Sequence, residues 1–479
     1  IDKTFSLFDF CKKKASKVQI YGEETLDDDG NIISFIDQAA LITHYLQLKD
    51  SEISLPYVSK AESILGLWYE FIKGEKKICT KDLECARESS VLLQTYLFPD
   101  LFQAPFQAPE NPKFTFIDLF AGIGGFHTAM HSVGAHCVFA SEWDKYARIS
   151  YEANYKDIEP GLFEKDSSGN YKYFNEDVTK ANPADIPDFD VCCGGFPCQP
   201  FSVAGLKRGF EDTRGTLFFN IANIVKYKIE NGCPPKVLFL ENVRGLKSHD
   251  KGNTLKVILA TLEELGYGVS YTVLNAKYFG VPQNRERLFI IAWYKKAINV
   301  ETFKFPYGID ADGNTIYDKS KLKEGTMPTK VSDIFEPDDA VADFTISDRM
   351  WEGHQRRKER NMANGKGFGY RKFFGDSEYC STISARYWKD GSEILIDQAD
   401  KNPRTLSPVE AGRLQGYRII GNGWKYPECA DNQNYNSANP EFRIVVSKKE
   451  AYHQFGNSVA VPVIKRLAQE IVNQLLNES

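Results

Sequence analysis

The stretch Phe114-Thr115-Phe116-Ile117-Asp118-Leu119-Phe120-Ala121-Gly122-Ile123-Gly124-Gly125-Phe126 decides the fold of this chain. Its first seven residues are rich in β-formers and alternate as in a strand, and residues 127–133 are typical of a helix. A strand, a glycine-rich turn and a helix open nucleotide-binding α/β units, where glycines let a ligand approach the backbone. A tight turn without a ligand is the alternative, because one such turn is weak evidence by itself.

Apolar runs and helical patterns then alternate as far as about residue 300. Further strands are expected at residues 138–141, 190–193, 237–240, 269–274 and 288–293, with a third strand ending near 176–179 and helices at 217–228 and 254–265. This alternation predicts a doubly wound, Rossmann-like α/β sheet. The carboxyl ends of parallel strands share one edge of such a sheet, so residues that follow different strands are expected to converge there.

The fourth strand ends in Gly194-Gly195-Phe196-Pro197-Cys198-Gln199-Pro200-Phe201-Ser202, which presents a single thiol. Most cysteines are small core hydrophobes, so a buried cysteine in a Gly-Pro break is the plain alternative. The other strand ends favour a reaction centre, because Glu142 and Glu241 follow the second and fifth strands and an arginine pair precedes a later one. These positions predict a cleft that holds a nucleotide-like cofactor, a thiol, an acid and guanidinium groups.

Composition bounds the class of protein. The chain has 479 residues, of which 42% are hydrophobic, and a length of this order suggests two or three domains. It has no apolar run of about 18 residues and its start lacks a signal-peptide layout, so we expect no membrane segment. The ten cysteines include no CxxC pair. We therefore expect free thiols in a reducing cytosol rather than disulfides, and no metal.

The remaining segments suggest additional domains. Residues 1–110 are predicted to be a helical extension, by default a small bundle, with a helix-turn-helix DNA reader as the alternative. The net charge is −6, yet eight basic residues stand against two acids between Arg349 and Lys372. That segment is either a solvated helix face or a surface that contacts phosphates. Ser407, Pro408 and Glu410 predict a capped helix start, and residues 463–476 predict an amphipathic C-terminal helix.

The chain resembles the S-adenosylmethionine-dependent DNA (cytosine-5)-methyltransferases of bacterial restriction-modification systems. The resemblance covers about residues 112–479. The motifs that carry it, in the family's order, are 116–126, Glu142-Trp143-Asp144, 195–202, Arg214-Gly215-Thr216-Leu217-Phe218, Glu241-Asn242-Val243, Gln283-Asn284-Arg285-Glu286-Arg287, Arg404-Thr405-Leu406-Ser407 to Gly416-Tyr417, and Phe455-Gly456-Asn457-Ser458-Val459.

The resemblance implies a division of roles. Cys198 would be the nucleophile that adds to C6 of the cytosine, Glu241 would protonate N3, and Arg287 and Arg285 would hold the base oxygen. S-adenosylmethionine, which leaves as S-adenosylhomocysteine, would be held by residues from several motifs: Asp118, Phe120, Ala121, Gly122, Ile123, Gly124, Gly125, Glu142, Trp143, Asp177, Val178, Pro197, Leu217, Asn457 and Ser458. The catalytic domain would comprise residues 111–300 completed by 445–479, because the C-terminal helix would fold back onto the first strand.

The resemblance also implies double-stranded DNA as substrate, with the target base flipped out of the helix. Residues 301–444 would form a smaller, mixed target-recognition domain. The DNA contacts would come from a loop and from this domain: Ser202, Val203, Ala204, Lys207, Arg208, Arg214, Arg356, Arg357, Arg371 and Thr382. A cognate restriction endonuclease would be the partner, and the chain would be a monomer. Its location would be the bacterial cytoplasm, in association with the nucleoid. The alternatives are an RNA cytosine-5 methyltransferase, a DNA-binding autoregulator on the same scaffold, and a Rossmann-type dehydrogenase.

Overall fold

The computed structural model describes residues 114–197, 217–367, 369–419 and 442–476. The predicted N-terminal helical extension, Cys198 and the loop from Ser202 to Arg214 lie outside these residues. None of the helices in the described part is both long and apolar enough to cross a membrane.

A seven-stranded sheet is the centre of the fold, in the order β3-β2-β1-β4-β5-β7-β6. Its strands are β1 (Phe114–Leu119), β2 (Ala135–Ser141), β3 (Phe174–Asn175), β4 (Val191–Gly195), β5 (Val237–Val243), β6 (Tyr267–Asn275) and β7 (Glu286–Tyr294). The predicted α/β class is confirmed. One detail differs from a wholly parallel sheet, because β7 lies between β5 and β6 and pairs antiparallel with both. The sequence alternation after residue 265 marks both strands but not their direction.

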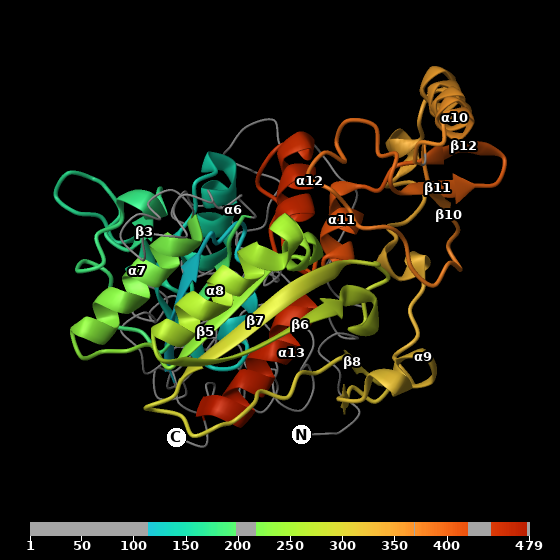
Figure 1. Ribbon diagram of the computed structural model, residues 1–479. Helices are drawn as coiled ribbons and strands as arrows, with labels where there is room; N and C mark the ends of the chain where they lie inside the picture. The colour runs from blue at the N-terminus through green and yellow to red at the C-terminus, as the bar shows by residue number, and fades with distance from the viewer. Residues whose placement is uncertain (1–113, 198–216, 368, 420–441, 477–479) are drawn as a thin grey trace, which may run out of the picture.

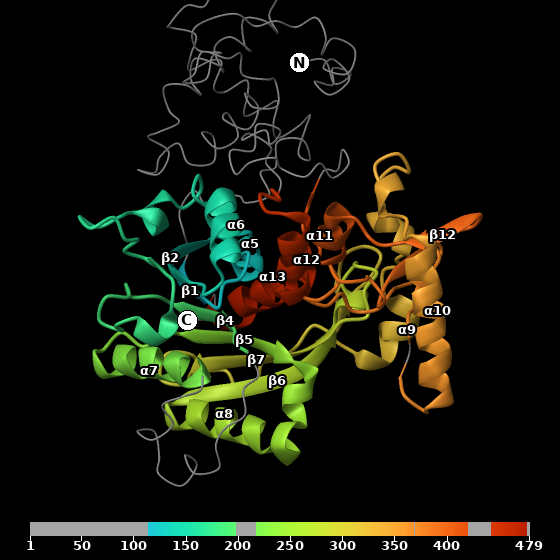
Figure 2. The ribbon, with the colours of Figure 1, turned by 90° about the horizontal axis from the view of Figure 1, so that it is seen from above.

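Both faces of the sheet are buried, which explains why its strands are apolar runs. Alternate side chains of one strand point to opposite faces. Phe116 therefore belongs to one hydrophobic core, whereas Ile117 and Leu119 belong to the other. Helices α5 (Gly125–His131), α6 (Lys145–Tyr155) and α13 (Val461–Ile471) cover the first face, and α7 (Leu217–Glu230) and α8 (Asn253–Glu264) cover the second (Figure 2).

The segment after β7 lies beside the sheet (Figure 1). It contains short elements: β8 (Gly308–Ile309), β9 (Thr315–Ile316), α9 (Leu322–Gly325), α10 (Asp348–Ala363), β10 (Lys372–Phe373), β11 (Leu395–Gln398), β12 (Lys401–Arg404) and α11 (Pro408–Leu414). Helix α10 stands on the outer flank (Figures 1 and 2). The basic run predicted from sequence begins in this helix, whose only buried residue is His354.

The C-terminal helices return to the first βα unit, as the sequence predicts. Helix α12 (Lys448–Asn457) leads into α13, which continues as a π-turn at Val472–Leu476. The contact is tight enough to exclude a side chain at Gly125, because a Cβ there would lie 2.4 Å from Val459. The hydroxyls of Ser458 and Tyr417 are 2.8 Å apart beside this contact. The last helices therefore complete the same core as the first strand.

The start of α11 is held by a buried ion pair. Ser407 and Glu410 form the predicted capping box, with Pro408 in the first turn. Glu410 also accepts two hydrogen bonds from the Arg404 guanidinium, at 2.7 and 2.9 Å. Both side chains are buried, so each charge is compensated almost entirely by the other.

We expect Glu410→Gln to lower the free energy of unfolding by about 3–5 kcal/mol, because it leaves the Arg404 charge buried without its counterion. Arg356→Ala is the control, because it breaks the exposed Arg356–Glu352 pair of α10 and is expected to cost at most about 1 kcal/mol. Urea denaturation followed by circular dichroism measures both. Equal losses for the two variants would contradict this assignment.

Candidate active site

The strand register brings the end of β4 against an acidic residue of β5. Gly195 is paired with Glu241, and a Cβ at Gly195 would lie 3.4 Å from the Glu241 carboxylate. The buried side chain of Asn242 donates a hydrogen bond of 2.7 Å to the carbonyl of Phe196. The chain is thus fixed in place two residues before Cys198. Asn242 belongs to the motif Glu241-Asn242-Val243, but the sequence alone assigns this residue no role.

Glu241 and Arg287 form an ion pair at the same place. The Arg287 Nε lies 3.1 Å from the Glu241 Oε1, and the two side chains are 19% and 11% exposed. The antiparallel pairing of β5 with β7 sets Arg287 opposite Val243, two residues along from Glu241, which explains the contact. Burial raises the pKa of the Glu241 carboxyl, and the charges of Arg287 and Arg285 lower it in part. The carboxyl can therefore retain a proton at a higher pH than an exposed glutamate.

Arg285 does not share this position, contrary to the prediction that it holds the base oxygen together with Arg287. Its side chain is buried, and its guanidinium donates to three backbone carbonyls, those of Ile383, Gly456 and Ser458, at 3.2, 3.1 and 2.6 Å. Burial lowers the pKa of Arg285 to about 9, so the group remains charged at neutral pH. With these donors engaged, Arg285 joins three segments of the fold.

Two buried glutamines extend this contact, and sequence reasoning missed both. The Gln283 side chain donates to the carbonyl of Leu414 and accepts from the Ile383 N–H. The Gln415 side chain donates to the carbonyl of Phe455. Both glutamines lie within motifs quoted from the sequence, and that was the only signal for them. The spacing of residues along the chain does not show which segments their side chains join.

The glycine-rich turn has two kinds of glycine. Gly122 has a φ of 56°, and a Cβ added there would meet no atom within 4 Å, so its backbone faces open space. Gly124 and Gly125 are instead required by packing, because a Cβ would collide with Tyr155 and Val459 respectively. Phe120 also has a positive φ, of 57°, directly before the turn. The open part of the turn, at Phe120–Gly122, is the part that a ligand can approach.

Glu142 lies against this open part. Its carboxylate accepts hydrogen bonds from the N–H groups of Gly122 and Asp144, both at 2.7 Å. Burial raises its pKa, and these two backbone bonds lower it in part. A carboxylate fixed beside a glycine-rich turn at the end of the second strand is where such folds bind ribose hydroxyls. The polar, open edge at Gly122 and Glu142 therefore fits a nucleoside-containing cofactor.

Trp143 and Asp177 share a groove of about 580 Å³ whose lining also includes Arg148, Asn175 and Lys180. The Trp143 side chain is 73% exposed, which leaves its face available for stacking. Two other predicted cofactor residues are placed differently. Asp118 is wholly buried beneath the turn and accepts from the Tyr151 hydroxyl at 3.4 Å, and Ile123 is buried as well. Their side chains support the turn rather than its open side.

The remaining predicted cofactor residues fall into three surroundings. Ala121 and Val178 are buried, Ser458 bonds Tyr417 in the C-terminal return, and Leu217 begins α7 against the second core. Pro197 and Asn457 are exposed at the ends of β4 and α12. Pro197 thus follows β4, and Ser458 follows α12 beside Gly125, while their contact with a cofactor stays a prediction.

The described DNA-binding candidates differ in availability. Arg356 is exposed on α10. Arg357 is engaged within the protein, with hydrogen bonds to Gly369, Asp390 and His354, so the predicted phosphate contact is not supported for this residue. Arg371 donates to the Ser381 hydroxyl, and the Thr382 hydroxyl donates to the carbonyl of Asn284. Thr382 thereby ties the segment after α10 to the residues just before β7.

Comparisons with known proteins place this chain in a family. The family model for C-5 cytosine-specific DNA methylases matches residues 114–473. The Type II methyltransferase M.SsoII of Shigella sonnei is 46% identical over 380 residues, which cover 79% of this chain and 84% of that protein. M.HhaI of Haemophilus parahaemolyticus is 35% identical over 371 residues, which cover 75% and 94% of the two chains. The crystal structure of S. pombe Dnmt2 methyltransferase matches with a TM-score of 0.52 at 18% identity, over 75% and 99%, and supports the fold.

The chain belongs to the C-5 cytosine-specific DNA methylase family. It is a DNA (cytosine-5)-methyltransferase, and this membership supports S-adenosylmethionine as its methyl donor. The dehydrogenase alternative is therefore wrong.

The same substitution at Arg285, just before β7, and at Arg287, within β7, should affect different properties. We expect the first to lower mainly stability and the second to lower mainly the rate of methyl transfer. Arg285→Met should lower the free energy of unfolding by about 3–5 kcal/mol, because it leaves three buried carbonyls without donors. Arg287→Met should cost at most about 2 kcal/mol in stability, because that side chain is partly exposed. It should slow methyl transfer by about 10²–10³-fold if it stabilises charge on the base. Denaturation and single-turnover assays separate the two, and equal stability losses would contradict the roles assigned here.

Proposed function

We propose that this enzyme methylates C5 of a flipped cytosine in a specific duplex sequence through a covalent bond between Cys198 and C6. The observation that carries the proposal is the largely buried Glu241–Arg287 pair beside the end of β4. It sets an acid with a raised pKa and a guanidinium beside the strand that leads to the only cysteine of that motif. These are the groups that an electron-poor ring needs if a thiolate is to add to it.

The chemistry follows from the weak nucleophilicity of C5. Addition of the Cys198 thiolate to C6 forms an S–C bond and moves the electron pair of the C5–C6 bond toward N3, where Glu241 supplies a proton. Arg287 would stabilise the developing charge on the base oxygen. Bound S-adenosylmethionine supplies an electrophilic methyl group to the activated C5. Loss of the C5 proton to a base and of the Cys198 thiolate from C6, with return of the N3 proton to Glu241, then restores the aromatic ring.

Three parts of the site would hold the cofactor. Glu142 would take the ribose hydroxyls, because its carboxylate is already fixed beside the open backbone at Gly122. Trp143 and Asp177 would border the adenine in their shared groove. The curated relatives are named Type II methyltransferases, so we further propose that the DNA sites modified by this enzyme are those of a cognate restriction endonuclease.

Bisulfite sequencing of plasmid DNA from cells that express the protein tests the reaction and reads the recognised sequence. We expect one methylated cytosine per site with the wild type, none with Cys198→Ser, and full methylation with the control Cys233→Ser, since Cys233 is an exposed thiol.

DNA with 5-fluorocytosine at the methylated position should trap a covalent adduct at Cys198, because fluorine cannot leave C5 as a proton does. Methyl transfer to tRNA but not to duplex DNA would instead favour the RNA alternative.

Glu241→Gln should slow single-turnover methyl transfer by about 10²–10⁴-fold, because glutamine has no carboxyl proton to donate. The sign of the pH effect follows from the raised pKa. In the wild type the rate falls as pH rises through the pKa of Glu241 and the acid form is lost, and this limb should vanish in the variant. Glu286→Gln is the control, because Glu286 pairs with Arg244 at the surface. An unchanged alkaline limb in Glu241→Gln would exclude the acid role.

A further inference from the structure

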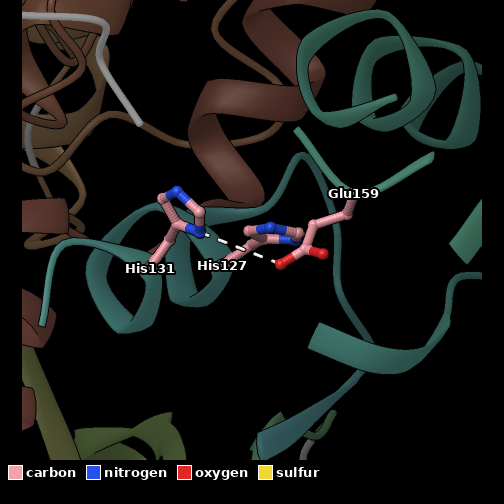
Figure 3. Close-up of side chains that lie close together, drawn as sticks. All are labelled: His127, His131 and Glu159. Carbon is pink, nitrogen blue, oxygen red and sulfur yellow. Dashed lines mark ion pairs between the residues drawn. The ribbon is translucent and has the colours of Figure 1, made fainter. Parts of the chain in front are cut away.

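A group of three metal-ligating side chains lies on the α5 side of the sheet, apart from the site described above. His127 and His131 are one helical turn apart on α5 and share a face, and Glu159 follows α6 (Figure 3). One nitrogen or carboxylate oxygen from each lies within 4.8 Å of the other two, and the His131 Nδ1 is 3.8 Å from the Glu159 Oε1. All three residues are at most 1% exposed.

His127 is oriented in the manner of a metal ligand. Its Nδ1 is 2.7 Å from the Tyr151 hydroxyl, which in turn donates to the Asp118 carboxylate at 3.4 Å. Because that hydroxyl has one proton and gives it to Asp118, it accepts the Nδ1–H of His127. The lone pair of the ring then resides on Nε2, which has no hydrogen-bond partner in the part of the chain that the structure describes. A metal-bound histidine usually donates its other ring N–H to a hydrogen-bond acceptor that fixes the ring, and here the Tyr151 hydroxyl, itself bonded to Asp118, is that acceptor.

Glu159 is also held from behind. Its Oε1 accepts the backbone N–H of Cys137 at 3.1 Å, and its Oε2 pairs with the His136 Nδ1 at 2.6 Å. Both contacts come from β2, so the carboxylate is fixed by a strand while its other neighbours lie on α5. His136 lies between Glu159 and the surface, because 32% of its side chain is accessible to solvent.

We propose that His127, His131 and Glu159 form a structural site for one divalent transition-metal ion of the Zn²⁺ class. Two imidazoles and one carboxylate match the ligand preference of Zn²⁺. Tetrahedral Zn²⁺ ligands lie roughly 3.3–3.6 Å apart, so the observed separations need only a small closure. The ion would join α5, and hence the glycine-rich turn before it, to β2 and the end of α6. The sequence predicts no metal because it lacks CxxC pairs, but this ligand set contains no cysteine.

The test is metal binding by the full-length protein. After chelation and dialysis against Zn²⁺, we expect one ion per wild-type chain by mass spectrometry of the metal content, and a melting temperature that falls when the ion is removed. Co²⁺ in its place should give tetrahedral d–d absorption without strong thiolate charge transfer. His131→Gln should lose the ion, whereas His354→Gln, which removes a buried histidine of α10, should retain it.

Tyr151→Phe keeps the ring and removes only the hydroxyl behind His127. We expect it to weaken Zn²⁺ affinity about 10–100-fold while the protein stays folded. This variant decides the matter if His131→Gln does not fold. A wild-type chain that takes up no ion, or one whose affinity is unchanged in Tyr151→Phe, would overturn the proposal.

Discussion

One buried guanidinium connects the parts of this enzyme that chemistry must bring together. Arg285 stands directly before β7, and its donors reach carbonyls of the segment after α10 and of the connection between α12 and α13. A buried guanidinium is costly unless carbonyls accept hydrogen bonds from it, and these three bonds form only when the segments have adopted their positions together. Arg287, two residues later, can face Glu241 only because that strand is held in this register.

The sheet and its helices could be predicted because their signals are local. The capping box at Ser407 and the order of the strands are found where the sequence places them. The strand ends are less exact, because β3 ends at Asn175 rather than near 176–179, and β5 continues past residue 240 to Val243. The antiparallel direction of β7 could not be predicted, because an apolar run does not encode the direction of a strand that is buried on both faces.

Positions of side chains near the strand ends were easier to predict than their partners. Glu142 lies beside the glycine-rich turn and Glu241, on β5, lies beside the end of β4, while their roles toward cofactor and base stay predictions. Arg285 and Arg357 were assigned to substrates, yet each donates its hydrogen bonds to the protein itself. An arginine can hold a carbonyl, a carboxylate or a phosphate equally well. The choice among these partners depends on which of them the fold brings near the guanidinium, and the spacing of residues along the sequence does not show that.

The packing of α13 on α5 has a consequence for synthesis on the ribosome. The first βα unit emerges from the ribosome well before α13, the helix that covers it. Until α13 has emerged, an apolar surface of the nascent chain lacks its cover, and domains generally fold as units once their segments are available. A message cut short before residue 461 would therefore yield a chain with an incomplete core. Methylating activity thus requires transcripts that are read through the segment that encodes α13.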